Sequence, residues 1–245
     1  MRIAVISDIH GNWHALRAVK KDIQKCGADK VFCLGDIVGY GPHPCRCLDQ
    51  IRSMAEAIIK GNHEDAICRR KECEERLSRY ALEGIRFTRK QLSQKDTEFL
   101  IALSDSFVSE ELNITLAHGA LTDERAWKYV ENEEQAKKEL DAAATGFSFV
   151  GHTHVPFVFG SGHGLFELLP ENLLLEKEEK FLINVGSVGQ PRDGDCRASY
   201  GLIELKGDSA VFNLRRVFYN IAKTEYAIEK ANLSRFLSER LYQGI

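Results

Sequence analysis

Five short apolar runs in the first 160 residues each end abruptly at glycine and polar side chains. Each run is four or five residues long and rich in β-branched or aromatic residues. Apolar runs of this length that are bounded by glycine are typical of buried β-strands. The predicted strands are Arg2–Ile6, Lys30–Leu34, Ala55–Ile59, Ile114–Ala117 and Phe147–Val150.

Helical patterns separate several of these runs. Residues Trp13–Cys26 carry one apolar stripe, and Gly27 follows as a stop signal. Because strands alternate with helices, we predict an α/β fold in which the loops after the strands converge on one site. The other predicted helices are Pro44–Met54, Tyr80–Leu103 as two helices with Ser93 capping the second, and Glu133–Ala144.

The second part of the chain has strand patterns without helices between them, which predicts a second, largely antiparallel sheet. The turn signals are Gly160–Gly164 and Gly207-Asp208, and a final helix is predicted at about Thr224–Tyr242. No linker interrupts the 245 residues, so we expect one domain over residues 1–245; the segment 121–146 receives no role. The predicted strands are Val155–Phe159, Leu165–Leu169, Phe181–Val185, Tyr200–Leu205 and Ser209–Val217.

Composition excludes several classes of protein. The formal net charge of −3 gives no signature of nucleic-acid binding. The seven cysteines show no CxxC spacing, so neither a zinc ribbon nor a disulfide framework is predicted. The apolar start of the chain is too short for a signal peptide, and no membrane span is evident. We therefore expect a cytoplasmic protein without a membrane partner, and the sequence makes no prediction about its oligomeric state.

Potential metal ligands gather in the polar clusters that follow the five predicted strands. A single Asp-x-His triplet or Gly-Asp pair is common, but here imidazole and carboxylate groups recur at every strand end. This mixture favours manganese, iron or zinc over magnesium or calcium. The ligands outnumber those that one ion uses, which predicts two ions sharing a carboxylate. The clustered residues are Asp8, His10, Asp36, Asn62, His63, His118, His152 and His154.

Other chemistries and the remaining histidines receive less support. The sequence has no GxSxG elbow, P-loop or GxGxxG motif, and no cysteine pairs with a histidine of these clusters, so serine- or cysteine-based catalysis is not predicted. His14, His43 and His163 are expected to be structural or surface residues, although His43 lies in a loop near the predicted site.

The five clusters together resemble the signature blocks of the calcineurin-like metallophosphoesterase superfamily, over roughly residues 1–200. Residues 35–42 and 184–193 resemble its compact prokaryotic branch, which includes phosphodiesterases and asymmetrical diadenosine tetraphosphate hydrolases. The resemblance implies a four-layer α/β/β/α sandwich with two mixed β-sheets. The blocks are Asp8-Ile9-His10, Gly35-Asp36, Gly61-Asn62-His63-Glu64, His118-Gly119 and Gly151-His152-Thr153-His154.

The resemblance also implies a role for each clustered residue. One metal would be held by Asp8, His10, Asp36 and His154, and the other by Asp36, Asn62, His118 and His152. The ions would be manganese, with iron, zinc or nickel as alternatives, and a hydroxide between them would attack phosphorus. His63 would bind no metal; it would protonate the leaving oxygen as a general acid.

Two positions depart from the protein serine/threonine phosphatases of this superfamily. Gly39 and Tyr40 stand where those enzymes carry an Asp that orients the catalytic histidine and an Arg that holds phosphate. This departure disfavours a protein phosphatase. Tyr40 is a candidate to stack on a nucleobase or simply to pack, and Arg192 is a candidate to contact phosphate or to stabilise a turn.

The leading hypothesis is therefore an enzyme that hydrolyses a small phosphodiester or a nucleotide polyphosphate. A nuclease is disfavoured by the net charge and by the lack of a basic, aromatic-rich groove. A phosphomonoesterase of the same superfamily remains an alternative. A non-catalytic interaction scaffold is disfavoured, because every ligand position and His63 are present.

Overall fold

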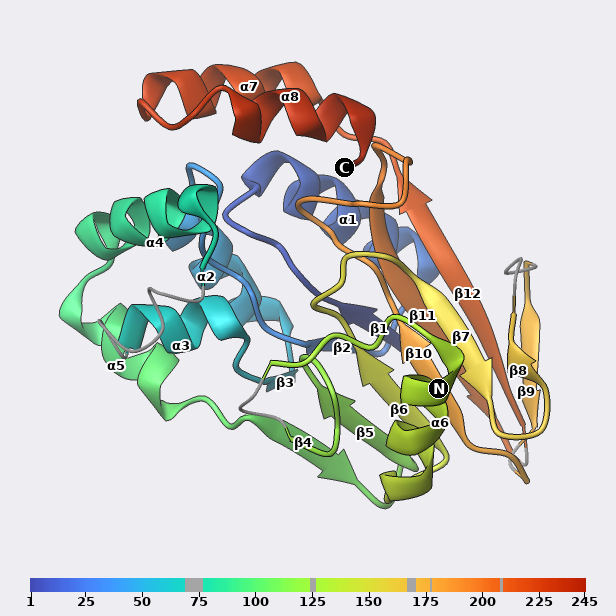
Figure 1. Ribbon diagram of the computed structural model, residues 1–245. Coiled ribbons are helices and arrows are strands. Elements are labelled where there is room, and N and C mark those ends of the chain that lie inside the picture. The colour runs from blue at the N-terminus through green and yellow to red at the C-terminus, as the bar shows by residue number, and fades with distance from the viewer. Residues whose placement is uncertain (69–76, 124–126, 167–170, 177, 208) are drawn as a thin grey trace.

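A computed structural model of the chain describes residues 1–68, 77–123, 127–166, 171–176, 178–207 and 209–245, and shows two six-stranded sheets with helices on their outer faces (Figure 1). The first sheet has the order β3 (Ala57–Ile58), β2 (Lys30–Cys33), β1 (Arg2–Ile6), β11 (Ala198–Lys206), β12 (Ser209–Val217) and β9 (Leu173–Glu176). The second has the order β4 (Ser106–Ser109), β5 (Ile114–Ala117), β6 (Phe147–Val150), β10 (Phe181–Asn184), β7 (Phe157–Gly160) and β8 (Gly164–Leu165).

Both sheets are mixed, as predicted. Strands β1, β2 and β3 run parallel, as do β5, β6 and β10, while the remaining pairs are antiparallel. The prediction that the late strands form a sheet of their own is wrong. Strands β11, β12 and β9 extend the first sheet from β1, and β10, β7 and β8 extend the second from β6. Strands β1 and β6 are buried, so the backbone groups on their free sides need partners, which β11 and β10 supply.

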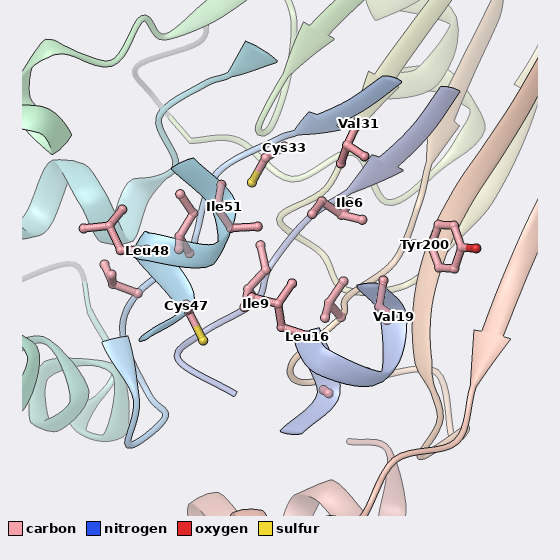
Figure 2. Close-up of a cluster of buried hydrophobic side chains, with 14 of the residues drawn as sticks. Ile6, Ile9, Leu16, Val19, Val31, Cys33, Cys47, Leu48, Ile51 and Tyr200 are labelled. Atoms are coloured by element: carbon pink, nitrogen blue, oxygen red, sulfur yellow. The ribbon is translucent and has the colours of Figure 1, made fainter. Parts of the chain in front are cut away.

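Alternate residues of each strand belong to different apolar layers, because successive side chains point to opposite faces of the sheet. Ile3 and Val5 of β1 belong to the apolar layer between the two sheets, with Phe149 of β6 and Phe212 of β12. Ala4 and Ile6 face the helices α1 (Trp13–Cys26) and α2 (Pro44–Met54) instead. Figure 2 shows this outer layer, where Ile6, Val31 and Cys33 lie near Leu16, Val19, Leu48 and Ile51.

The fourth layer is the helix α6 (Glu133–Ala142), which covers the outer face of the second sheet. Ala136 and Leu140 of this helix pack with Val150 and Leu182. The α/β/β/α sandwich is therefore confirmed, with the two sheets in contact at its centre and the helices outside.

The helices begin and end at the signals in the sequence. The side chain of Asn12 accepts the N–H of Ala15 at the start of α1, and Gly27 ends this helix with φ 63°. Ser93 caps α5 (Gln94–Ala102) after the end of α4 (Arg79–Gln91), as predicted, and forms a capping box with Asp96. Among the described residues, no helix is both long and apolar enough to cross a membrane.

Several elements differ from the predictions. The final helix is two helices, α7 (Ile221–Lys230) and α8 (Phe236–Gln243), because the chain turns at Asn232 with φ 52°. Strands β4 and β9 and the helix α3 (Asn62–Cys68) were not predicted. The predicted strand 165–169 overlaps β8 only at Leu165, and residues 167–170 and Asp208 of the second turn signal lie outside the described residues.

Candidate metal centre

The loops that follow β1, β2, β5 and β6 meet at one edge of the two sheets. The N–H of Asp8 donates to the carbonyl of Gly35 at 3.1 Å, and that of His10 to Asp36 at 2.8 Å. The N–H of Gly151 donates to His118 at 2.9 Å, which joins the two loops of the second sheet. The predicted convergence of the polar clusters is therefore confirmed.

The side chains of these loops form three overlapping groups of possible metal ligands. Within each group, one ligand atom of each residue lies within 4.8 Å of the others, and all the residues are buried. The groups share His10 and Asp36, so they make up one continuous cluster. They are Asp8, His10 and His154; His10, Asp36 and His63; and Asp36, His118 and His152.

Four histidines of the cluster each place one ring nitrogen against a backbone carbonyl. This nitrogen must carry the proton and donate it, which leaves the other nitrogen to face the cluster. The contacts are His10 Nδ1 with Val38 O at 3.2 Å, His118 Nδ1 with Leu34 O at 2.8 Å, His154 Nδ1 with Gln190 O at 2.5 Å, and His152 Nε2 with Trp127 O at 3.0 Å.

These anchors create a repulsion that a cation would remove. The Nε2 atoms of His10 and His154 lie 3.1 Å apart, and the anchored Nδ1 atoms leave a lone pair on each of them. The buried Oδ1 of Asp8 has no hydrogen-bond partner and lies 3.2 Å from His154 Nε2. Facing lone pairs and an unpaired buried carboxylate oxygen fit a bound metal ion.

Asp36 occupies the middle of the cluster. Its Oδ1 accepts the N–H of His63 at 2.9 Å. Its Oδ2 lies 3.7 Å from His10 Nε2, 3.4 Å from His118 Nε2 and 3.9 Å from His63 Nε2. The same His118 nitrogen lies 3.2 Å from Oδ1 of Asn62, which brings the predicted amide ligand into the cluster.

The protonation states suit metal ligands. Burial lowers the pKa values of His10 and His154, and burial with the neighbouring His118 charge lowers that of His152 to about 3. Burial also lowers the pKa of His118, but Asp36 and Asp8 outweigh it and raise this pKa to about 10. A proton on His118 therefore gives the two carboxylates a positive partner. A bound metal ion would supply this positive charge in place of the proton.

Left-handed backbone conformations concentrate at this site. Ten non-glycine residues of the described chain have positive φ, and six of them belong to the predicted site. Such conformations strain most side chains, and Asp, Asn and His tolerate them best. The conformation recurs at Asp8 and His10 and again at His152 and His154, and both residues of each pair belong to the cluster. The six are Asp8 (54°), His10 (48°), Asp36 (50°), Tyr40 (50°), His152 (66°) and His154 (63°).

His63 differs from the four anchored histidines. It lies buried in the first turn of α3, and its Nδ1 has no hydrogen-bond partner. Gly39 lies directly against this nitrogen: a Cβ at Gly39 would be 1.9 Å from Nδ1. The rings of His10 and Tyr40 flank His63, with ring centroids 4.6 Å and 4.8 Å away.

Tyr40 packs within the protein. Its exposed fraction is 8%, and it belongs to an apolar cluster with Ala81 of α4 and with Leu237 and Leu241 of α8. The sequence left stacking on a nucleobase and packing within the protein as alternatives for Tyr40. In the structure, most of this ring packs against other residues of the chain.

Glu64 was not recognised from the sequence, although it ends one of the signature blocks. Its buried carboxylate accepts the N–H groups of Asp36, Ile37, Val38 and Gly61, at 2.7, 2.9, 3.2 and 2.9 Å. These contacts hold the loops after β2 and β3 together. Burial and the Asp36 charge raise the pKa of Glu64 to about 7.

The segment 121–146 also contributes residues that the sequence analysis missed. Trp127 supplies the carbonyl that anchors His152, and the Tyr129 ring stacks on His152 with centroids 4.3 Å apart. Tyr129 is 44% exposed, so one part of its ring is open to a ligand. The sequence feature that could have identified them is this pair of aromatic residues between two polar clusters. Residues 124–126 of the segment lie outside the described part of the chain.

Arg192 lies in the loop after β10, beside the cluster. Its N–H donates to the carbonyl of His154 at 3.3 Å, and its Nη2 donates to Oε1 of Gln190 at 3.0 Å. The three other histidines lie outside the cluster. His14 and His43 pair with ring centroids 5.7 Å apart, and His163 binds Glu179 on the surface at 2.9 Å.

Comparisons with known proteins agree with this geometry. The profile of the calcineurin-like phosphoesterase superfamily domain matches residues 1–208. The uncharacterized protein MJ0912 of Methanocaldococcus jannaschii is 37% identical over 99% of this chain and 98% of its own. A metallophosphoesterase structure from Sphaerobacter thermophilus aligns with 100% of this chain and 99% of its own, at 33% identity and TM-score 0.86. A hypothetical protein, PH1004 of Pyrococcus horikoshii OT3, shares the fold at 18% identity and TM-score 0.78, over 100% of this chain and 98% of its own.

Proposed function

Because the chain belongs to the calcineurin-like phosphoesterase superfamily, we propose that it hydrolyses a phosphodiester or a nucleotide polyphosphate with two divalent transition-metal ions. The observation that carries this proposal is the set of four carbonyl-anchored histidines around Asp8 and Asp36. Such a set aims imidazole nitrogens and carboxylate oxygens at one buried cluster, which is the chemistry of a transition-metal site.

Asp36 is the residue proposed to bridge the two ions. One ion would be held by Asp8, His10, Asp36 and His154, and the other by Asp36, Asn62, His118 and His152. Manganese is proposed first, with iron, zinc or nickel as alternatives. When bound, the two ions supply an acidified water and neutralise negative charge on the phosphoryl group.

His63 is proposed as the general acid for the leaving oxygen. Its ring is held by contacts with Tyr40 and His10 rather than by a carbonyl, so its proton is not committed to the backbone. Burial lowers the pKa of His63, and an anionic substrate beside it would stabilise the protonated form. Arg192 would bind the phosphate from the same side as His154.

Gly39 and Tyr129 support the proposed substrate class. A side chain at Gly39 would collide with His63, so the orienting carboxylate of the protein phosphatases has no room here. The exposed ring of Tyr129 next to His152 favours a substrate with a nucleobase, since stacking on an aromatic ring contributes about 1–3 kcal/mol. Tyr40 retains a proposed part in substrate binding through its contact with His63.

The test combines metal analysis with a substrate panel. The panel contains bis(4-nitrophenyl) phosphate, 4-nitrophenyl phosphate, diadenosine tetraphosphate, cyclic nucleotides, single-stranded DNA and a phosphopeptide. We expect chelation to abolish turnover and manganese to restore it. Asp36→Asn should lower the content of both ions, whereas Asp49→Asn, on the exposed side of α2, should lower neither. A metal-free sample with full activity contradicts the metal mechanism, and a phosphopeptide ranked first contradicts the proposed substrate class.

A further inference from the structure

An open cavity of about 530 Å³ lies at the surface, where α7 meets the first turn of α1 and the loop before α2. Figure 1 shows α7 outside the first sheet, next to α1. The hydroxyl of Thr224 in α7 donates to Oδ1 of Asn12, the N-cap of α1, at 3.0 Å. The wall of the cavity is therefore formed by segments that are fixed relative to one another.

Apart from one tyrosine, the titratable groups that line this cavity are all basic. Lys223 and Lys230 line it from α7, where a spacing of seven residues puts both on the same face of the helix. His14 and His43 line it from α1 and from the loop before α2, with ring centroids 5.7 Å apart. Among the described residues, no carboxylate lines the cavity.

The two lysines have no counter-charge within the described part of the chain. Neither Lys223 nor Lys230 forms an ion pair there. The acidic residues of α7 lie elsewhere on the helix. Glu225 accepts the hydroxyl of Tyr242 at 2.6 Å, and Glu229 is adjacent in sequence to Lys230, a spacing at which helical side chains do not face each other. Neighbouring cations that lack a carboxylate favour a bound anion.

The two histidines lie in the same positive environment. Burial, and then the charges of three cations led by Arg17, lower the pKa of His14. Burial, with the charges of His14 and Arg46, lowers the pKa of His43 to about 4. Arg17 and Arg46 each follow one of these histidines by three residues, which is nearly one helical turn. The buried Nδ1 of each histidine has no hydrogen-bond partner, so no acceptor fixes the tautomer, and a neutral ring can donate to an anion through Nε2.

The rest of the cavity wall is apolar. Pro42, Ala227 and Ala231 contribute to it, together with the ring of Tyr226, which is 58% exposed. The Nζ of Lys230 lies 4.8 Å from the centroid of this ring. Cavities of about 300–1,000 Å³ that combine an apolar wall with a few polar groups are typical of small-molecule sites. The wall therefore suits a ligand with an anionic group and a planar apolar part.

We infer that this cavity binds a phosphorylated small molecule of about nucleotide size, at a site separate from the metal centre. The lysine and histidine donors would hold the phosphate, and Tyr226 with the apolar wall would contact the base. The inference does not depend on the proposed function, because no residue of the metal cluster lines the cavity. The two sites are nevertheless adjacent: the N–H of His43 donates at 3.0 Å to the carbonyl of Gly11, the residue after His10.

The experiment measures calorimetric binding of adenosine monophosphate, adenosine and orthophosphate to the full chain. The double variant Lys223→Gln/Lys230→Gln is compared with Lys137→Gln/Lys138→Gln, a matched loss of two exposed lysines from α6 on the second sheet. We expect the parent to bind the monophosphate more tightly than adenosine or orthophosphate. The α7 double variant should lose at least about tenfold in affinity for the monophosphate, as for lost hydrogen bonds to a charged group, and the α6 variant should bind like the parent.

A second variant tests the apolar part of the site. Tyr226→Ala removes a largely exposed ring, so it should fold like the parent. We expect it to weaken binding of the monophosphate and to leave orthophosphate binding unchanged. If the α7 double variant melts at a clearly lower temperature, Tyr226→Ala decides the question alone.

The outcomes separate this site from the metal centre. Both double variants should turn over bis(4-nitrophenyl) phosphate like the parent, and a loss of turnover in the α7 variant contradicts a separate site. A parent chain without metal-dependent turnover contradicts the proposed function, whereas the calorimetry still tests the cavity. An α7 variant that binds as much monophosphate as tightly as the parent, or an equal loss in the α6 variant, overturns the inference. Orthophosphate bound as tightly as the monophosphate indicates an adventitious ion only, and tighter binding of single-stranded RNA or a phosphopeptide indicates a macromolecular partner; either result overturns it as well.

Discussion

Replacing Gly39 with alanine tests whether the position of His63 controls turnover. The new Cβ would lie 1.9 Å from His63 Nδ1, whereas ordinary contacts begin at 3.4 Å. The ring must therefore move by about 1.5 Å, and a misplacement of about 1 Å can lower the rate on the order of 10²-fold. We expect Gly39→Ala to lower kcat by at least about 10²-fold while both metal ions stay bound.

The control is Gly164→Ala, because Gly164 also has a left-handed backbone, with φ 75° against 85° at Gly39, but nothing lies within 4 Å of its Cβ. Both variants carry a backbone strain of roughly 1–2 kcal/mol, which thermal unfolding measures. Only Gly39→Ala should lose activity, measured on nitrophenyl diesters under one metal condition. In a His63→Ala background, Gly39→Ala should have little further effect. If Gly39→Ala turns over within about threefold of Gly164→Ala, the proposed role of His63 is wrong.

Three further predictions concern single side chains. His63→Ala should keep both metal ions and lose on the order of 10²–10⁴-fold in kcat, with a smaller loss for leaving groups that are already stable anions; a defect that ignores leaving-group basicity contradicts the assignment. Tyr129→Ala should raise KM for nucleotides by the loss of about 1–3 kcal/mol of stacking and spare bis(4-nitrophenyl) phosphate, and equal losses for both argue against a base at this ring. Burial, with the His14 and Arg46 charges, lowers the pKa of His43 to about 4, so the unfolded chain binds more protons between pH 6.5 and 4 and stability falls as the pH drops through this window. In urea unfolding, His43→Gln should make the loss of unfolding free energy over this window smaller by about 1–2 kcal/mol, a value lowered because solvent screens the half-exposed ring. A variant with the same pH dependence as the parent contradicts this explanation.

Local patterns in the sequence were sufficient for most of the elements. The helix limits at Trp13–Cys26 and Pro44–Met54 agree with the structure. Asn12 and Gly27 cap the first helix, Pro44 begins the second, and each helix has an apolar stripe. The pairing of the late strands was not predictable in the same way. An apolar run such as 200–205 shows that a strand is buried, but the pattern does not say which strand it joins. Its antiparallel register with β1, for example Ala4 with Leu202, depends on contacts far apart in the chain.

The candidate site likewise contains residues that local sequence patterns predict and residues that they do not. The residues that gather there were predictable because each follows a strand and lies in a short block. Glu64 was not, since its role arises from contacts with the N–H groups of another loop. The anchoring carbonyls were not predictable either, because any residue supplies one and only the folded backbone aims it.

The cluster also lies across the junction between the two sheets. Asp8 and Asp36 follow strands of the first sheet, and His118 and His152 follow strands of the second, so bound ions would act as a cross-link between them. Ions that bind only the folded chain stabilise it by about 2.7 kcal/mol when their free concentration is 100 times the dissociation constant. An unfolding event that separates the sheets would have to release the ions first. Metal supply would then govern how long the folded chain survives as well as how fast it turns over substrate.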